Sequence, residues 1–145
     1  MLTPDIQLAL QRAELFPLAT ASRSGTPNVV PVKYVRAAGP DRLWITDNYL
    51  GKTLANLREN PEAALYVWST EPKLCVQIKG TVTIHTEGDD YESMKAQVRA
   101  GKPELPAKSL VVLRIREIFQ CLPGAEPGKR LWPTPEAAAA ESPAP

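Results

Sequence analysis

The chain has 145 residues, of which 43% are hydrophobic and 23% charged, and its formal net charge at pH 7 is +1. This length and composition predict one globular domain with a single core. Basic and acidic residues are mixed along the sequence, without the charged footprint of a protein that binds nucleic acid or an anionic membrane. No run of about 18 apolar residues suggests a membrane span, and no leader is evident. We therefore expect a cytoplasmic protein that binds neither nucleic acid nor membrane.

The first predicted elements are a helix and a hairpin. Thr3 can cap the helix, and Pro4 suits its first position. Residues 16–21 and the valine-rich residues 28–36 then read as two strands joined by a polar, glycine-containing turn. The chain is thus expected to begin with a helix followed by a β-hairpin.

The middle of the chain is predicted to contain three strands and one helix. A strand at 43–46 precedes a helix at 53–60, which Pro61 ends. Residues 63–69 form an apolar strand. Residues 74–86 show the clearest alternation in the protein, with one apolar and one polar face. Tyr66, Trp68 and Trp44 are expected to pack in the core.

The last third is predicted to contain a helix, a strand and a tail. The helix runs over about 88–100, and the strand covers 109–121. Residues 123–145 are rich in proline, glycine and alanine, and roughly the last dozen cannot bury enough apolar surface to fold. The inner face of the last strand is expected to consist of Val111, Leu113, Ile115 and Phe119.

Six strands joined mostly by short turns do not make the alternation of a parallel sheet. An antiparallel β-barrel with peripheral helices, formed by residues 1–122, fits better. Side chains fill the interior of so small a barrel, so a flat cofactor would lie outside it, against a rim or a second subunit. This placement favours a dimer.

A polar turn at 47–51 delivers Lys52 and Thr53 to the start of the second predicted helix. A lysine, a hydroxyl and free backbone N–H groups at a helix N-terminus are the groups that bind a phosphate monoester. The alternative is that Asn48 or Thr53 only caps the helix and that Lys52 is a solvated charge. The sequence leaves both interpretations open.

The chain has two cysteines, Cys75 and Cys121, and one histidine, His85. The cysteines lie in strand-like runs outside any Cys-x-x-Cys or Cys/His cluster, so reduced sheet or core thiols are expected. A single histidine argues against a histidine-rich metal site or a His-based triad. His85 is expected to be an exposed strand residue.

Four stretches, taken in order, resemble the pyridoxamine 5′-phosphate oxidase-like family of FMN-binding split barrels, in its short single-domain form. They are residues 25–34 (GTPNVVPVKY), 43–48 (LWITDN), 52–61 (KTLANLRENP) and 76–80 (VQIKG). The resemblance covers most of residues 6–120. It implies a mainly β (α+β) fold, a six-stranded antiparallel split β-barrel with peripheral helices, and a homodimer with FMN at the subunit interface.

The resemblance also implies a role for each matching segment. Backbone groups of Pro31, Val32 and Lys33 would border the isoalloxazine ring. The ring edge or ribityl chain would meet Thr46, Asp47 and Asn48. The 5′-phosphate would be held by Lys52 and Thr53. Pro31 also suggests an edge strand by itself, because a proline removes a donor from the β-ladder.

Two further residues are candidates for a contact across the interface. Cys75 falls where fuller oxidases place a polar side chain from the second subunit, although a buried free thiol is the alternative. Trp132 lies in a segment with little local core, so the first part of the tail is a candidate for docking on a partner subunit.

The implied function is that of an FMN-dependent oxidoreductase that passes hydride or electrons between a small-molecule or protein redox partner and bound FMN. The C-terminal Arg-x-His pattern of true pyridoxamine phosphate oxidases is missing, since the chain has only Lys-Arg-Leu-Trp at 129–132, so vitamin B6 oxidation is not expected. The alternatives are a non-catalytic FMN-binding electron carrier or sensor, and a relative that binds deazaflavin, haem or no cofactor.

Overall fold

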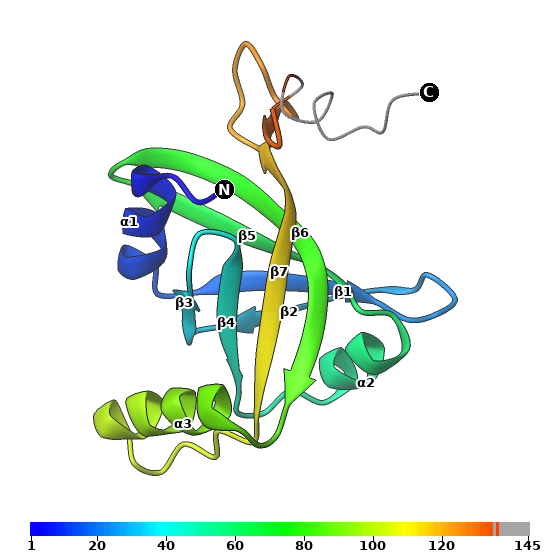
Figure 1. Ribbon diagram of the computed structural model, residues 1–145. Helices are drawn as coiled ribbons and strands as arrows, with labels where there is room; N and C mark the ends of the chain where they lie inside the picture. Colours follow the sequence, from blue (N-terminus) through cyan, green and yellow to red (C-terminus); the bar gives the residue numbers. More distant parts are fainter. Residues whose placement is uncertain (135, 137–145) are drawn as a thin grey trace.

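A computed structural model describes residues 1–134 and 136 of the chain, and shows a strongly curled antiparallel sheet with helices at its margins (Figure 1). The helices are α1 (Pro4–Arg12), α2 (Lys52–Glu59) and α3 (Asp89–Gly101). The strands are β1 (Phe16–Ala21), β2 (Pro27–Val32), β3 (Val35–Ala37), β4 (Arg42–Asp47), β5 (Glu62–Thr70), β6 (Lys73–His85), β7 (Ser109–Gln120) and β8 (Arg130–Trp132).

The strands follow the order β2-β1-β5-β6-β7-β4-β3, and β8 pairs with β7. Strands β2 and β3 stand at opposite ends of this order, although only Lys33 and Tyr34 separate them in sequence. The sheet must therefore curl so that these two end strands come close together without pairing, which produces the half-barrel. The mainly β fold with peripheral helices is confirmed.

The expected count of six strands was wrong, because the described residues form eight. The predicted strand 28–36 divides in two, since its first part pairs with β1 and its last part with β4. The carbonyl of Tyr34 accepts a hydrogen bond from the Thr46 N–H at 3.0 Å as the chain changes partner. Residues 130–132 add the eighth strand.

A bulge in the long β6–β7 ladder decides which side chains face the core. Lys79 pairs with Glu117, but the next residue, Gly80, pairs with Ile115. Beyond this shift Ile118 is fully buried, whereas Phe119 is only half-buried. The expectation that Phe119 lines the core was therefore wrong, because periodicity alone cannot reveal the extra residue in one strand.

Gly80 is required at this bulge. A β-carbon at position 80 would collide with the carbonyl group of Arg114. A glycine inside a strand commonly marks such a close approach of two backbones.

Strand β5 places alternate side chains on opposite faces of the sheet. Leu65 and Val67 are fully buried in the main core, whereas Tyr66 and Trp68 are 36% and 48% exposed. The expectation that both aromatic residues pack in the core was wrong. Their strand has a core on one side only, and they occupy the outer positions.

The helices pack against the strands from the margins of the half-barrel: α1 against β3 and β5, α2 against β1 and β2, and α3 against β4 and β7. In α1, the Thr3 hydroxyl caps the helix by accepting the Ile6 N–H at 3.2 Å, as predicted. Helix α3 contributes Tyr91 and Met94 to a small second core. The Tyr91 hydroxyl donates to the Ala107 carbonyl at 2.9 Å, which fixes the segment that leads into β7.

Strand β8 attaches part of the predicted tail to the sheet of its own chain. Ile118 of β7 pairs with Trp132, whose half-buried ring packs against the main core. The prediction that about the last dozen residues are disordered falls mostly on residues 135 and 137–145, which lie outside the described part of the chain.

Candidate functional site

The corner between β4 and α2 is built around a buried carboxylate. Asp47 is fully buried, and its Oδ1 accepts the Leu50 N–H at 3.0 Å. Its Oδ2 accepts the hydroxyl of Ser109 at 2.8 Å, while the Lys108 ammonium lies 3.8 Å from Oδ1. The side chain of Asp47 thus fixes the turn that precedes α2.

Asn48 completes the same corner. Its Oδ1 accepts the buried N–H of Ala107 at 3.0 Å, and Ala107 has a positive φ of 44°. A side chain that satisfies a buried donor in an uncommon backbone conformation has a structural role. Asp47 and Asn48, two of the three residues predicted to meet the ring edge or ribityl chain, therefore use their side chains to hold the corner that precedes α2.

Helix α2 begins at an exposed lysine. Its N-cap is Gly51, no side chain caps its first turn, and that turn contains no acidic residue. The Ala55 N–H donates to the Gly51 carbonyl at 3.1 Å. The N–H groups of residues 52–54 belong to the first turn, where an α-helix provides no backbone acceptor. Lys52 adds a positive charge at this end, without an acidic partner among the described residues.

The side chain of Thr53 points away from solvent. It is 1% exposed, and its Oγ1 accepts a hydrogen bond from the Asn28 amide at 3.0 Å. The same amide also lies 3.3 Å from the hydroxyl of Thr20, which accepts from Asn56 at 3.1 Å. This network ties α2 to β1 and β2, so Thr53 offers a ligand its backbone N–H and little of its side chain.

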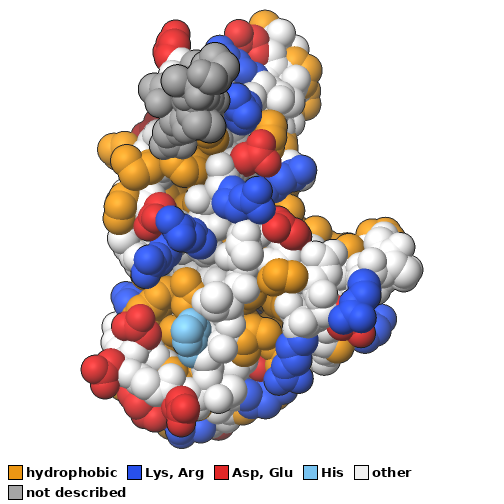
Figure 2. Space-filling view, turned by 45° about the vertical axis from the view of Figure 1, so that its right-hand side comes forward, with side chains coloured by type: hydrophobic (Ala, Val, Ile, Leu, Met, Phe, Trp, Pro, Cys, Tyr) orange, Lys and Arg blue, Asp and Glu red, His pale blue; other side chains and the backbone are white. Residues whose placement is uncertain are grey.

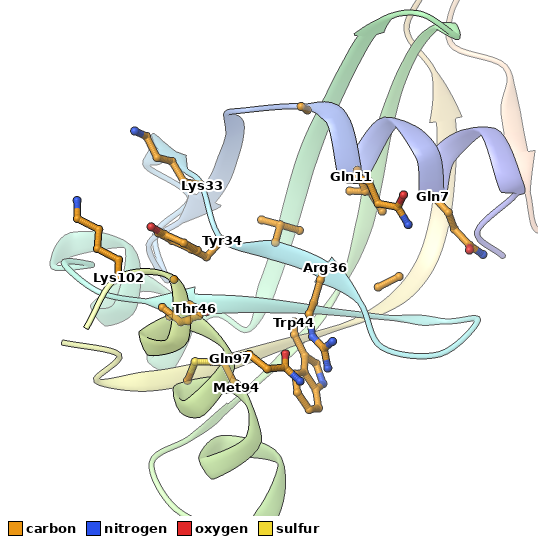
Figure 3. A pocket seen from close by; sticks show the side chains of 16 residues that line it. Gln7, Gln11, Lys33, Tyr34, Arg36, Trp44, Thr46, Met94, Gln97 and Lys102 are labelled. Atoms are coloured by element: carbon orange, nitrogen blue, oxygen red, sulfur yellow. The ribbon is translucent and has the colours of Figure 1, made fainter. Parts of the chain in front are cut away.

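A cavity of about 840 Å³ lies between α1, α3 and the β3–β4 edge of the half-barrel. Figure 3 shows Lys33, Tyr34 and Lys102 on one side, Gln7 and Gln11 of α1 on the opposite side, and Arg36 and Trp44 close to Gln97 between them. Among the described residues that line it there are three basic side chains and no aspartate or glutamate. The cavity therefore favours a negatively charged ligand.

Arg36 and Trp44 form a platform within the cavity. The two residues are paired across β3 and β4, and the guanidinium carbon of Arg36 lies 4.5 Å from the centre of the Trp44 ring. A guanidinium held over an indole in this way is a stable arrangement. Trp44 is half-buried against the second core, so the expectation of core packing describes only part of its surroundings.

The predicted site residues fall into three groups. Lys33 and Thr46 line the cavity. The α2 corner holds Asp47, Asn48, Lys52 and Thr53. The third group lines neither: Pro31, exposed on β2, and Val32, buried in the main core, directly precede Lys33, whereas Cys75 is on β6 and Trp132 on β8.

Cys75 lies on the outer face of the half-barrel. It pairs with the exposed Trp68, and it is buried without belonging to the main core. Its hydrogen bond with Tyr66, helped by burial, raises the pKa of the Tyr66 hydroxyl to about 12. Burial, and next the neighbouring Cys75, raise the pKa of the Cys121 thiol.

Sequence reasoning missed most of the cavity. Arg36 is on β3 and Gln97 is on α3, and no motif or regular spacing in the sequence relates the two residues. Lys102 follows α3, far from β3 in sequence. Asn28 was within a matching stretch, but only its contact with Thr53 reveals that it anchors α2.

Figure 2 shows basic and acidic side chains interspersed over one face, in keeping with the low net charge. Across the described residues, no group of three or more His, Cys, Asp or Glu side chains could hold a metal ion. The same part of the chain has no helix with the length and hydropathy of a membrane span. His85 is exposed, with a ring nitrogen 3.0 Å from the Thr83 hydroxyl.

The chain is similar to several known proteins. An uncharacterised protein of Methanocaldococcus jannaschii is 33% identical over 130 residues, which cover 88% of this chain and 86% of that protein. The crystal structure of HupZ from Group A Streptococcus has a TM-score of 0.76 at 26% identity and covers 88% of this chain and all of that one. A putative pyridoxamine 5′-phosphate oxidase from Lactobacillus delbrueckii has a TM-score of 0.67 at 27% identity, covering 81% and 93%.

More distant structures share the fold. They include an FMN-binding protein of Syntrophomonas wolfei (18% identity, TM-score 0.71), an F420 reductase (21%, 0.61) and the haem storage protein HutZ of Vibrio cholerae (16%, 0.61). They cover 82%, 77% and 82% of this chain, and 84%, 94% and 94% of their own. The family model described as pyridoxamine 5′-phosphate oxidase matches residues 2–122. With this match over most of its length, the chain belongs to the pyridoxamine 5′-phosphate oxidase family of split barrels.

Proposed function

We propose that the protein binds FMN and acts as a homodimeric oxidoreductase that passes hydride or electrons between the flavin and a small-molecule or protein redox partner. The observation that carries this proposal is the start of α2, where Lys52 stands beside free N–H donors without a side-chain cap or an acidic residue in the first turn. Such a helix end lacks an anion, which a flavin phosphate would supply.

The residues present fit FMN. Lys52 and the first-turn N–H groups would hold the phosphate, with Asp47 and Asn48 keeping the corner in shape. Pro31, which is exposed on β2, would border the ring, and the ring would extend toward Lys33 and Thr46 at the rim of the cavity. When bound, FMN supplies the one- and two-electron chemistry.

The outer face of the sheet supports the proposal of a homodimer. Val29, Tyr66 and Trp68, which the register places on this face, expose 66%, 36% and 48% of their surfaces. Neighbouring exposed apolar side chains on a sheet face are typical of a surface that another chain covers. A partner on this face would bring its Cys75 near a flavin at the interface, the role proposed for that residue.

The cavity would receive the second reactant. Lys33 and Thr46 would contact the flavin on one side and line the cavity on the other. Since three basic side chains and no acidic ones among the described residues line it, the proposed reactant is a small anionic molecule. Lys33 and Lys102 would bind its charged group.

A non-catalytic electron carrier or sensor is the second candidate. The observation that favours it is that no histidine or carboxylate, among the described residues, lines the cavity to serve as a general acid or base. Solved structures of this fold include an FMN-binding protein, an F420 reductase and a haem storage protein. A deazaflavin such as F420, or haem, is therefore an alternative cofactor for this chain. Haem would need an axial ligand, for which the chain has one histidine.

The first experiment is the visible absorption spectrum of the purified protein before and after dialysis with excess FMN, with the released cofactor identified by mass. Flavin bands at about one FMN per chain, with a dimer in light scattering, support the proposal. A protein that stays colourless with FMN but takes up F420 or haem contradicts it.

Turnover then separates the enzyme from the carrier. The loaded protein is mixed with reduced nicotinamides and a panel of anionic and neutral acceptors. Lys102→Gln is expected to raise KM for anionic acceptors by about tenfold while sparing neutral ones, since it removes one charged contact. Lys95→Gln, on α3 but outside the cavity lining, is the matched control. Absence of turnover with every pair would favour the carrier.

A further inference from the structure

The two cysteines, 46 positions apart in the sequence, are neighbours across two strands. The β6–β7 ladder pairs Val76 with Gln120, so the next pair along it is Cys75 with Cys121. The N–H of Cys121 donates to the Cys75 carbonyl at 2.8 Å, which extends the ladder to this pair. Their spacing in the sequence does not predict this pairing.

The geometry suits a covalent bond between the two sulfurs. Residues directly opposite in an antiparallel pair have α-carbons about 4.5–5.5 Å apart, and disulfides span about 4.4–6.8 Å. Both side chains lie on the outer face of the sheet, as Trp68 beside Cys75 shows. Both thiols are free in this structure, and the Cys121 thiol donates to the Phe119 carbonyl at 3.9 Å.

We propose that Cys75 and Cys121 form a redox-active dithiol that closes to a cross-strand disulfide by exchange with low-molecular-weight disulfides of the glutathione type. The pair lies outside the cavity and the α2 corner of its own chain, on the sheet face that the proposed partner subunit would cover. Closing the disulfide does not require flavin, so the two proposals can fail separately. The disulfide would link the start of β6 to the residue that follows β7.

The order of attack follows from exposure. Cys75 is 2% exposed, whereas Cys121 is half-buried and reachable from solvent. The Cys121 thiol loses its proton, and its sulfur attacks the external disulfide, which forms a mixed disulfide and releases one thiol. The Cys75 thiol then loses its proton, and its sulfur displaces the second external thiol from Cys121. Two protein thiols are oxidised and one external disulfide is reduced to two thiols.

The test uses the full chain, with and without FMN, equilibrated in mixtures of reduced and oxidised glutathione. Free thiols are counted after denaturation, and intact mass is measured. The expected result is loss of both thiols, a mass lower by two hydrogens, and one peptide pair that joins Cys75 to Cys121. Two free thiols under the most oxidising mixture, or disulfides only between chains, would overturn the proposal.

Two variants test the order of attack. In Cys75→Ser, Cys121 is expected to stop at a stable mixed disulfide with glutathione. In the matched Cys121→Ser, the buried Cys75 is expected to stay free while the protein remains folded by circular dichroism. Equal glutathionylation of the two variants would contradict the assignment of Cys121 as the attacking thiol, and glutathionylation of both cysteines in the wild type without ring closure would refute the pair.

Discussion

Helices α2 and α3 start in opposite electrostatic surroundings, although both have a glycine as N-cap and neither has a side-chain cap. The first turn of α3 contains Asp89, Asp90 and Glu92, so its own chain supplies negative charge to the helix dipole. The first turn of α2 contains no acid, and it starts at Lys52. The difference supports the proposal that α2 receives an external anion, whereas α3 has acidic residues of its own at this end.

The two helices also differ in how they are anchored. Helix α3 packs through Tyr91 and Met94 in the second core. Helix α2 is held by polar contacts at its start. Asp47 fixes the turn before the helix, and the Asn28 side chain donates to Thr53 in its first turn. Polar anchoring of this kind fixes the position of the helix end, which a binding site requires.

The largest effect is expected from Asp47→Ala. It leaves the N–H of Leu50 and the hydroxyl of Ser109 without their buried acceptor, so the free energy of unfolding should fall by ~3 kcal/mol. Urea unfolding measures this change. The control is Asp41→Ala, whose side chain is 36% exposed and whose carboxylate lies 3.9 Å from Arg42. Equal losses in the two variants would refute the role of Asp47 at the α2 corner.

Lys52→Ala should weaken FMN by roughly tenfold to a hundredfold, since a hydrogen bond to a charged group contributes about 1.5–3 kcal/mol. Riboflavin, which has the ring without the phosphate, should bind the variant and the wild type alike. Fluorescence titration with both ligands measures the difference. Arg58→Ala, in the last turn of the same helix, is the control. Equal weakening of FMN and riboflavin would remove Lys52 from the phosphate site.

Thr53→Val distinguishes the side chain from the backbone at the helix start. It removes the acceptor of the Asn28 amide but keeps the N–H of residue 53, so stability should fall by ~1 kcal/mol. FMN affinity should change by less than in Lys52→Ala. If the variant lost FMN more severely than Lys52→Ala while remaining folded, the Thr53 hydroxyl would itself be a ligand.

The smallest effect is expected from Asp90→Asn in α3. Removing one carboxylate from the first turn should lower stability by about 0.5 kcal/mol, and less in high salt, because the interaction with the helix dipole is screened. FMN affinity should be unchanged. A loss of stability that does not depend on salt, or a change in FMN binding, would show that Asp90 has a role beyond its interaction with the dipole of α3.

The sequence by itself determined the local structure. Thr3 and Pro4 indicated the start of α1, and the alternation over 74–86 indicated β6. These signals depend on neighbouring residues, which a sequence displays directly. The start of α2 at Lys52 was recognisable for the same reason, within one residue of the observed helix.

Only the tertiary structure decided what the distant segments do together. The bulge at Gly80 turns the Phe119 side chain away from the core. Tyr66 and Trp68 are exposed because their side chains are on the outer face of the sheet. The cavity, the anchoring of Thr53 by Asn28 and the contact between the two cysteines each join segments far apart in the chain. Such contacts depend on strand register and sheet curvature, which are set by the packing of the whole half-barrel rather than by the residues of any one segment.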